Sequence, residues 1–129
     1  MRTVFLLVAA LVTLGPQTIG AQRTNAQSEK LLAAAQHKAT VDGDLKGAIE
    51  DYKKIVAGAG SNRRLAAQAL VRMAECYQKL GDAEAQRIYE RVLREYPDQI
   101  ETAATAQARL ARTDTVARSA GMKIGRAHV

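Results

Sequence analysis

LVRMAECYQKLGDAEAQRIYERVLREYP, residues Leu70–Pro97, is the stretch of this 129-residue chain that decides its fold. Apolar residues recur in it at steps of three and four, the spacing that places side chains on one face of an α-helix. Gly81-Asp82 interrupts the pattern, because glycine adopts the left-handed conformation that ends a helix and aspartate caps the next one. Pro97 then disfavours helix at the residue before it. The stretch therefore predicts a hairpin of two helices. Its apolar positions are Leu70, Met73, Ala74, Tyr77, Ala85, Ile88, Tyr89, Val92 and Leu93.

An earlier part of the chain repeats this hairpin. Gly43-Asp44 lies 38 positions before Gly81-Asp82, and Leu32 lies 38 before Leu70. Ala48 and Tyr52 precede their counterparts Ala85 and Tyr89 by 37 positions. A period in this range, with a helix–turn–helix in each unit, is the signature of a helical solenoid.

The same periodicity sets the expected extent of the helical domain, residues 28–112. The first helix begins at Ser28 and ends before Val41–Asp44, and the second, capped by Asp44, runs to the loop Gly58–Asn62. The Leu70–Pro97 hairpin follows, and a fifth helix runs from Asp98 to near Arg112. The sequence thus predicts an all-α fold of helix–turn–helix repeats, about two and a half units long.

These residues resemble the tetratricopeptide repeat, and the resemblance covers about residues 28–112. The second unit carries the first-helix signature, the Gly-Asp turn, the second-helix positions Ala85, Tyr89 and Val92, and the closing Pro97. The first unit departs from the signature, because Gln36 and Ala39 replace the usual small residue and aromatic and no closing proline follows. The resemblance implies a tetratricopeptide-like α-solenoid in which alanines allow close helix pairs and tyrosines fill the wedge between hairpins.

The resemblance also implies a binding surface. In this family the first helix of each unit forms an inner, concave wall that holds peptides or partner domains. Members that grip a C-terminal carboxylate use a Lys and an Asn at positions that here hold Val71 and Glu75, so we expect no carboxylate capture. The predicted partner-binding residues are Gln68, Val71, Arg72, Glu75, Gln78 and Lys79.

The beginning of the chain has the pattern of a bacterial signal peptide. Arg2 supplies a positive charge, and Val4–Leu14 is an apolar run of about 11 residues, too short to cross a bilayer. Cleavage after Ala21, or one residue earlier, would leave residues 22–27 as a polar lead-in. The alternative interpretation is a short buried helix. We expect a periplasmic or secreted protein without a stable membrane anchor after cleavage, because no cysteine follows the apolar run to carry a lipid.

The end of the chain, residues 113–129, is predicted to be a disordered or artefactual tail. Lys123–Val129 equals the translation of a common short-read sequencing adapter, AAG ATC GGA AGA GCA CAC GTC, whose next bases, TGA, are a stop codon. We therefore expect the genuine sequence to stop near Met122 and the gene to continue; the alternative is a genuine basic tail. A chain ending there leaves the fifth helix uncapped, with an apolar stripe open to self-association. That stripe consists of Ala103, Ala104, Ala106 and Leu110.

No pattern predicts catalysis, a cofactor or a metal ion. His37 has no partner at metal-ligand spacing, and Asp42 and Asp44 fit helix caps better than a calcium loop, because the closing glutamate is missing. Cys76, the one cysteine, is expected to be a buried, inert thiol.

The charge of the chain also argues against nucleic acid as a partner. The net charge is +6, but without Arg2, Lys123 and Arg126 there are 16 basic and 13 acidic residues. This balance is too mild, and too poor in interleaved aromatics, to predict nucleic-acid binding.

The leading functional prediction is an exported protein–protein interaction module that is not an enzyme. By resemblance it belongs with the tetratricopeptide proteins of the bacterial cell envelope, and its partner is a protein or peptide that the sequence does not identify. A first alternative is the N-terminal part of a larger envelope protein with a C-terminal TolB-like β-propeller. A second is a non-catalytic lead-in to an enzyme domain.

Overall fold

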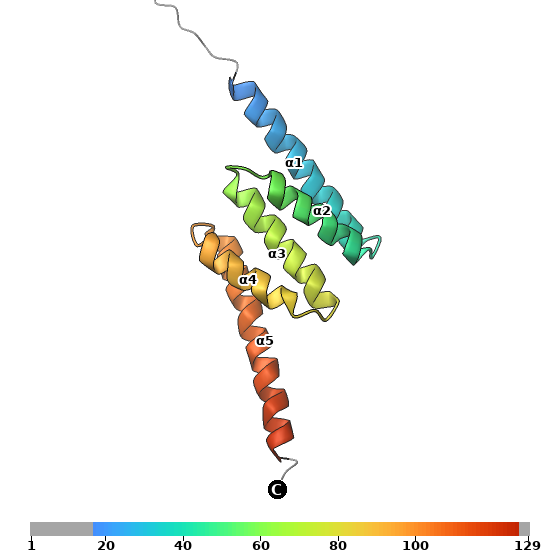
Figure 1. Ribbon diagram of the computed structural model, residues 1–129, viewed down its shortest axis with the longest axis vertical. Helices are drawn as coiled ribbons and strands as arrows, with labels where there is room; N and C mark the ends of the chain where they lie inside the picture. Colours follow the sequence, from blue (N-terminus) through green and yellow to red (C-terminus); the bar gives the residue numbers. More distant parts are fainter. Residues whose placement is uncertain (1–16, 127–129) are drawn as a thin grey trace, which may run out of the picture.

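The computed structural model describes residues 17–126 as five α-helices joined by short turns (Figure 1). Each helix turns back against the one before it, and α3 also contacts α1 and α5. The described residues contain no strand, so the all-α repeat solenoid that the sequence predicts is confirmed. The helices are α1 Gln17–Thr40, α2 Leu45–Gly58, α3 Arg63–Lys79, α4 Glu84–Glu95 and α5 Ile100–Arg126.

A glycine with positive φ lies at both hairpin turns, as predicted, but the aspartate after it is the N-cap of the next helix only in the first hairpin, because Ala83 holds that position in the second. Gly43 and Gly81 have φ angles of 70° and 71°, values that favour glycine over residues with a Cβ. Asp44 caps α2, where its side chain accepts a hydrogen bond from the Gly47 amide at 2.9 Å. Asp82 accepts a bond of the same length from the Glu84 amide. The two glycines therefore stand at equivalent helix reversals, which is the structural basis of the repeat.

The first and last helices are longer than predicted. Helix α1 starts at Gln17 and includes the lead-in 22–27, which carries no proline or glycine to stop a helix. The predicted signal peptide lies outside the described residues except for 17–21, which belong to α1.

Helix α5 continues through residues 113–126, where the sequence predicts a tail, and residues 127–129 lie outside the described part. The hydroxyls of Thr113, Thr115 and Ser119 donate to carbonyls four residues earlier, so these polar side chains are accommodated within the helix.

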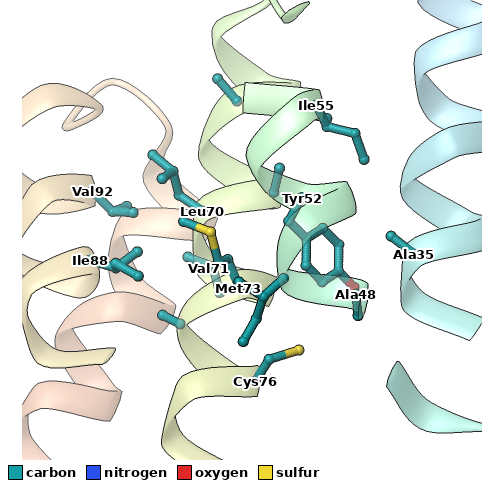
Figure 2. Packing of buried hydrophobic residues seen from close by; sticks show 14 of the residues in the cluster. Ala35, Ala48, Tyr52, Ile55, Leu70, Val71, Met73, Cys76, Ile88 and Val92 are labelled. Atoms are coloured by element: carbon teal, nitrogen blue, oxygen red, sulfur yellow. The ribbon is translucent and has the colours of Figure 1, made fainter. Parts of the chain in front are cut away.

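Helix α3 lies at the centre of the core. Figure 2 shows Leu70, Val71 and Met73 of α3 between Tyr52 of α2 on one side and Ile88 and Val92 of α4 on the other. This central position buries nine of the seventeen residues of α3.

Two equivalent tyrosines fill the spaces between helices. Tyr52 and Tyr89 are each only 1% exposed, and burial raises the pKa of each phenol to about 12. Ala48 and Ala85, which precede them by one helical turn, are buried as well, so small side chains allow the close approach that the tyrosines complete. The Tyr89 hydroxyl donates to Gln78 Oε1 at 3.1 Å, which ties α4 to the end of α3.

Arg63, the first residue of α3, holds the turn between α4 and α5. Its guanidinium donates through Nε to Asp98 Oδ2 at 3.1 Å and through Nη2 to Asp98 Oδ1 at 2.5 Å. Nη2 also donates to the Glu95 carbonyl, and the group lies 4.9 Å from the centre of the Tyr96 ring. Hydrogen bonds from Arg63, and then from Gln99, hold the pKa of the Asp98 carboxyl well below its usual range.

The first prediction concerns Tyr89. Tyr89→Ala should lower the free energy of unfolding by about 3–5 kcal/mol, because the cavity it leaves lies between three packed helices. Tyr89→Phe keeps the ring and removes only the bond to Gln78, so about 1 kcal/mol should be lost. Urea unfolding followed by circular dichroism measures both changes. Equal losses for the two variants would contradict the packing role of the ring.

The second prediction concerns pH. The folded state depresses the pKa of Asp98, so the stabilisation from its ionised form is present above the unfolded pKa, near 4, and disappears as pH falls below it. Between about pH 5 and pH 2 the wild-type melting temperature should fall more steeply than that of Asp98→Asn.

Asp114→Asn is the matched control for that experiment, because Asp114 is exposed and makes no ion pair within the described residues. The melting temperature of Asp114→Asn should fall with pH in the same way as that of the wild type. If the melting temperatures of the wild type and Asp98→Asn fall in parallel, the contact between Arg63 and Asp98 does not contribute to the pH dependence of stability.

Candidate functional site

A groove runs along α3 between α1 and α5, and we call it the α3 groove. Its middle part has a volume of about 390 Å³, and a second part of about 480 Å³ lies towards the C-terminal end of α3. A smaller part of about 200 Å³ lies near the start of α3. The two larger parts are lined by Leu32, Gln36, Thr40, Gln68, Val71, Arg72, Glu75, Gln78, Lys79, Glu101, Thr102, Thr105 and Arg109.

All six residues predicted to form the inner wall lie in this groove. Val71 is buried, Gln68 and Glu75 are half-buried, and the other three are exposed. The structure therefore brings Gln68, Val71, Arg72, Glu75, Gln78 and Lys79 onto one surface. Their role in binding a partner stays a prediction.

Sequence reasoning missed the walls that α1 and α5 contribute. The repeat spacing contains part of this information, because Thr40 lies 38 positions before Gln78 and Thr105 lies 37 after Gln68. Applying the inner-wall positions to the neighbouring units would have found these two residues, but not Glu101.

Glu75 links two walls of the groove. Its Oε2 accepts a hydrogen bond from Arg72 Nη1, and its Oε1 accepts one from Arg109 Nη2 on α5, both at 3.1 Å. The Glu75 side chain is 20% exposed, so the two guanidinium groups compensate a partly desolvated carboxylate. Gln78 is fixed in turn by the Tyr89 hydroxyl. The floor of the groove is thus connected to the core and to α5.

Charge changes sign along the groove. The part near the C-terminal end of α3 has three cations, Arg72, Lys79 and Arg109, and one carboxylate, Glu75. The middle part and the part near the start of α3 contain two further carboxylates, Glu29 and Glu101, and one further cation, Arg64. Between the two ends lie uncharged amides and hydroxyls, which offer both donors and acceptors of hydrogen bonds.

The remaining candidate chemistry is limited. Cys76 is 3% exposed, and burial raises the pKa of its thiol, so the sulfur stays protonated at neutral pH and is a poor nucleophile. The described residues contain no group of three or more His, Cys, Asp or Glu side chains placed to hold a metal ion. Among these same residues, no helix has the length and apolar character needed to cross a membrane.

A second hollow, of about 500 Å³, lies where the outer half of α5 diverges from α4. Tyr89, Ala83 and Ala85 form one side, and Val116 and Ala117 on α5 form the other. Of the predicted uncovered stripe on α5, Ala106 is buried, Ala103 and Leu110 are half-buried, and Ala104 is exposed. Further along α5, Val116 is a large apolar side chain that is 69% exposed. Self-association through the last helix stays a prediction.

The match to a known family falls on the central hairpin. Residues 68–98 match the tetratricopeptide repeat. The matched segment begins at Gln68 in the groove, includes the Gly81 turn and α4, and ends at Asp98, which Arg63 holds. Comparisons with curated proteins and with solved structures gave no match.

The repeat match and the helical hairpins together support a tetratricopeptide repeat protein. Such repeats are typically non-catalytic modules that bind other proteins. The α1–α2 hairpin lies outside the matched segment, but its turn glycine has nearly the same φ and it carries an equivalent buried tyrosine.

Proposed function

We propose that this protein is an exported scaffold that binds an extended segment of another polypeptide in the α3 groove. The observation that carries the proposal is that the six inner-wall residues share one groove with side chains from α1 and α5. An extended segment lying along α3 would contact three helices at once, and the repeat match supports a protein as the partner.

The lining of the groove suits a polypeptide main chain. Gln36 and Gln68 face the same hollow as Thr102 and Thr105. Each amide offers two donors and an acceptor, and each hydroxyl offers both functions, so together they complement the N–H and C=O groups of an extended segment. The buried Val71 gives the floor an apolar contact for one of its side chains. Because α3 is anchored in the core, little ordering of the wall itself would be needed on binding.

Export is the part of the proposal that rests on sequence. A positive charge, an apolar run of signal length and the Gly15-Pro16 break support a cleaved leader and a periplasmic or secreted protein. The alternatives, repeats that precede a TolB-like β-propeller or an enzyme domain, concern a longer chain and stay predictions. In either of these longer proteins, the α3 groove could bind a segment of the same polypeptide or a segment of a separate partner.

The third prediction tests the groove. Displayed random 12-residue peptides selected on the full chain should bind at least about 10-fold more weakly to the double variant Gln36→Arg/Gln68→Arg. The two added side chains fill the hollow and replace amides that pair with the peptide main chain. Fluorescence anisotropy of the selected peptides measures the change.

The control is Gln27→Arg/Gln107→Arg, the same pair of substitutions at exposed positions on α1 and α5 that do not line the groove. It should bind the peptides as the wild type does. Selected peptides that bind both double variants equally well would place the binding surface elsewhere and refute the proposal.

A further inference from the structure

The end of the α3 groove near the C-terminus of α3 is a cluster of cations built around one carboxylate. Arg72 and Lys79 come from α3, and Arg109 comes from α5. Glu75 lies between the two arginines and bonds to both. Thr40 and Gln78 complete the lining with a hydroxyl and an amide. The four charged residues together carry a charge of +2 at neutral pH.

The two arginines have unused hydrogen-bonding capacity. A guanidinium has five N–H donors in a planar fork, and Arg72 and Arg109 each direct one nitrogen at Glu75. Neither makes another hydrogen bond to a side chain within residues 25–121, and their side chains remain 45% and 35% exposed. Each can therefore receive a second carboxylate while keeping its bond to Glu75.

Lys79 adds a cation without an ion-pair partner in the described part of the chain. Lys79 lies in the last turn of α3, and Thr40 is the last residue of α1, so the C-terminal ends of two helices are near the hollow. The free carbonyls at each of these ends contribute about half a negative charge. The net charge of the hollow therefore falls from +2 to about +1. A ligand that enters it is thus favoured if it carries negative charge.

The cluster is also organised in advance. Glu75 is anchored on the most buried helix and holds in place Arg72 of the same helix and Arg109 of α5. Fixing a long cationic side chain normally costs conformational entropy on binding, and here part of that ordering already exists in the free protein. The volume of about 480 Å³ is enough for one or two side chains of an extended segment.

We propose that this hollow binds acidic side chains, aspartate or glutamate, of the polypeptide segment that lies in the α3 groove. The inference rests on the proposed function and adds the chemical class of the partner. The opposite end of the groove carries two carboxylates, Glu29 and Glu101, against one added cation, Arg64, so its net negative charge disfavours the same residues. The charge difference therefore also orients the segment, with its acidic part at the C-terminal end of α3.

The test uses three fluorescein-labelled 12-residue peptides of Ser and Asn around a central triplet. The first contains Glu-Asp-Glu and an amidated C-terminus, and the second replaces the triplet with Gln-Asn-Gln. The third is the neutral peptide with a free C-terminal carboxylate. Anisotropy titrations with the full chain should show the acidic peptide binding at least about 10-fold more tightly than either neutral one. This advantage should shrink when salt is raised from about 20 mM to about 200 mM.

Variants locate the effect. Lys79→Gln and Arg109→Gln should each weaken binding of the acidic peptide by about 3- to 10-fold and leave the neutral peptides unchanged. Arg112→Gln, one turn further along α5 and outside the hollow, is the matched control and should bind as the wild type does. Lys79→Gln removes no hydrogen bond or ion pair of the Lys79 side chain within the described residues, so its effect is independent of the bonds to Glu75.

The outcomes separate the two proposals. If the acidic and neutral peptides bind equally and Gln36→Arg/Gln68→Arg weakens both, the acidic preference is refuted and the α3 groove stands as a binding site. Preference for the free carboxylate alone, or equal effects of Arg109→Gln and Arg112→Gln, also refutes it. If none of the three peptides binds, the acidic preference fails, while the displayed-peptide selection decides on the groove independently.

Discussion

Helix α3 is in contact with every other described helix of this protein. It packs most extensively on α2 and α4 and makes smaller contacts with α1 and α5, which pack mainly on α2 and α4 respectively. Such a position requires small side chains, because helices approach closely only where little bulk lies between them. Ala66, Ala67, Ala69 and Ala74 provide this on α3, and Tyr52 and Tyr89 fill the spaces that the alanines leave beside them. The alanine-rich composition is therefore a condition of the architecture.

The same constraint creates the candidate site. A helix that is packed on two sides retains one open face, and on α3 this face carries Arg72, Glu75 and Lys79. Helices α1 and α5 flank it because the solenoid places the first helix of each unit on the same side. The groove is thus a direct product of the stacking, and its rigidity comes from the core beneath it. Contacts such as Tyr89 with Gln78 and Arg109 with Glu75 transmit that rigidity to the polar surface.

Local chemistry was enough to predict the hairpins and the burial of the two tyrosines, whereas the predicted α3 wall rests on the resemblance to the tetratricopeptide repeat. Gly43 and Gly81 mark turns on their own, and the apolar spacing identifies which face of each helix is buried. The outer extensions of α1 and α5 were not predictable in this way, because no proline or glycine lies within residues 22–27 or 113–120. Arg63 with Asp98 and Glu75 with Arg109 are separated by 35 and 34 positions. Pairs of charged surface residues that distant in sequence leave no periodic signal, so only the folded arrangement reveals them.

Amide hydrogen exchange of the folded protein tests the central role of α3 most directly. If α3 holds the other helices, its amides from Leu65 to Cys76 should exchange most slowly, at the rate of global unfolding. Residues 113–121 of α5, all exposed, should exchange orders of magnitude faster, because an unpacked helix segment opens locally. Exchange of α3 as fast as that of residues 113–121, or slower exchange in α1 than in α3, would contradict the account.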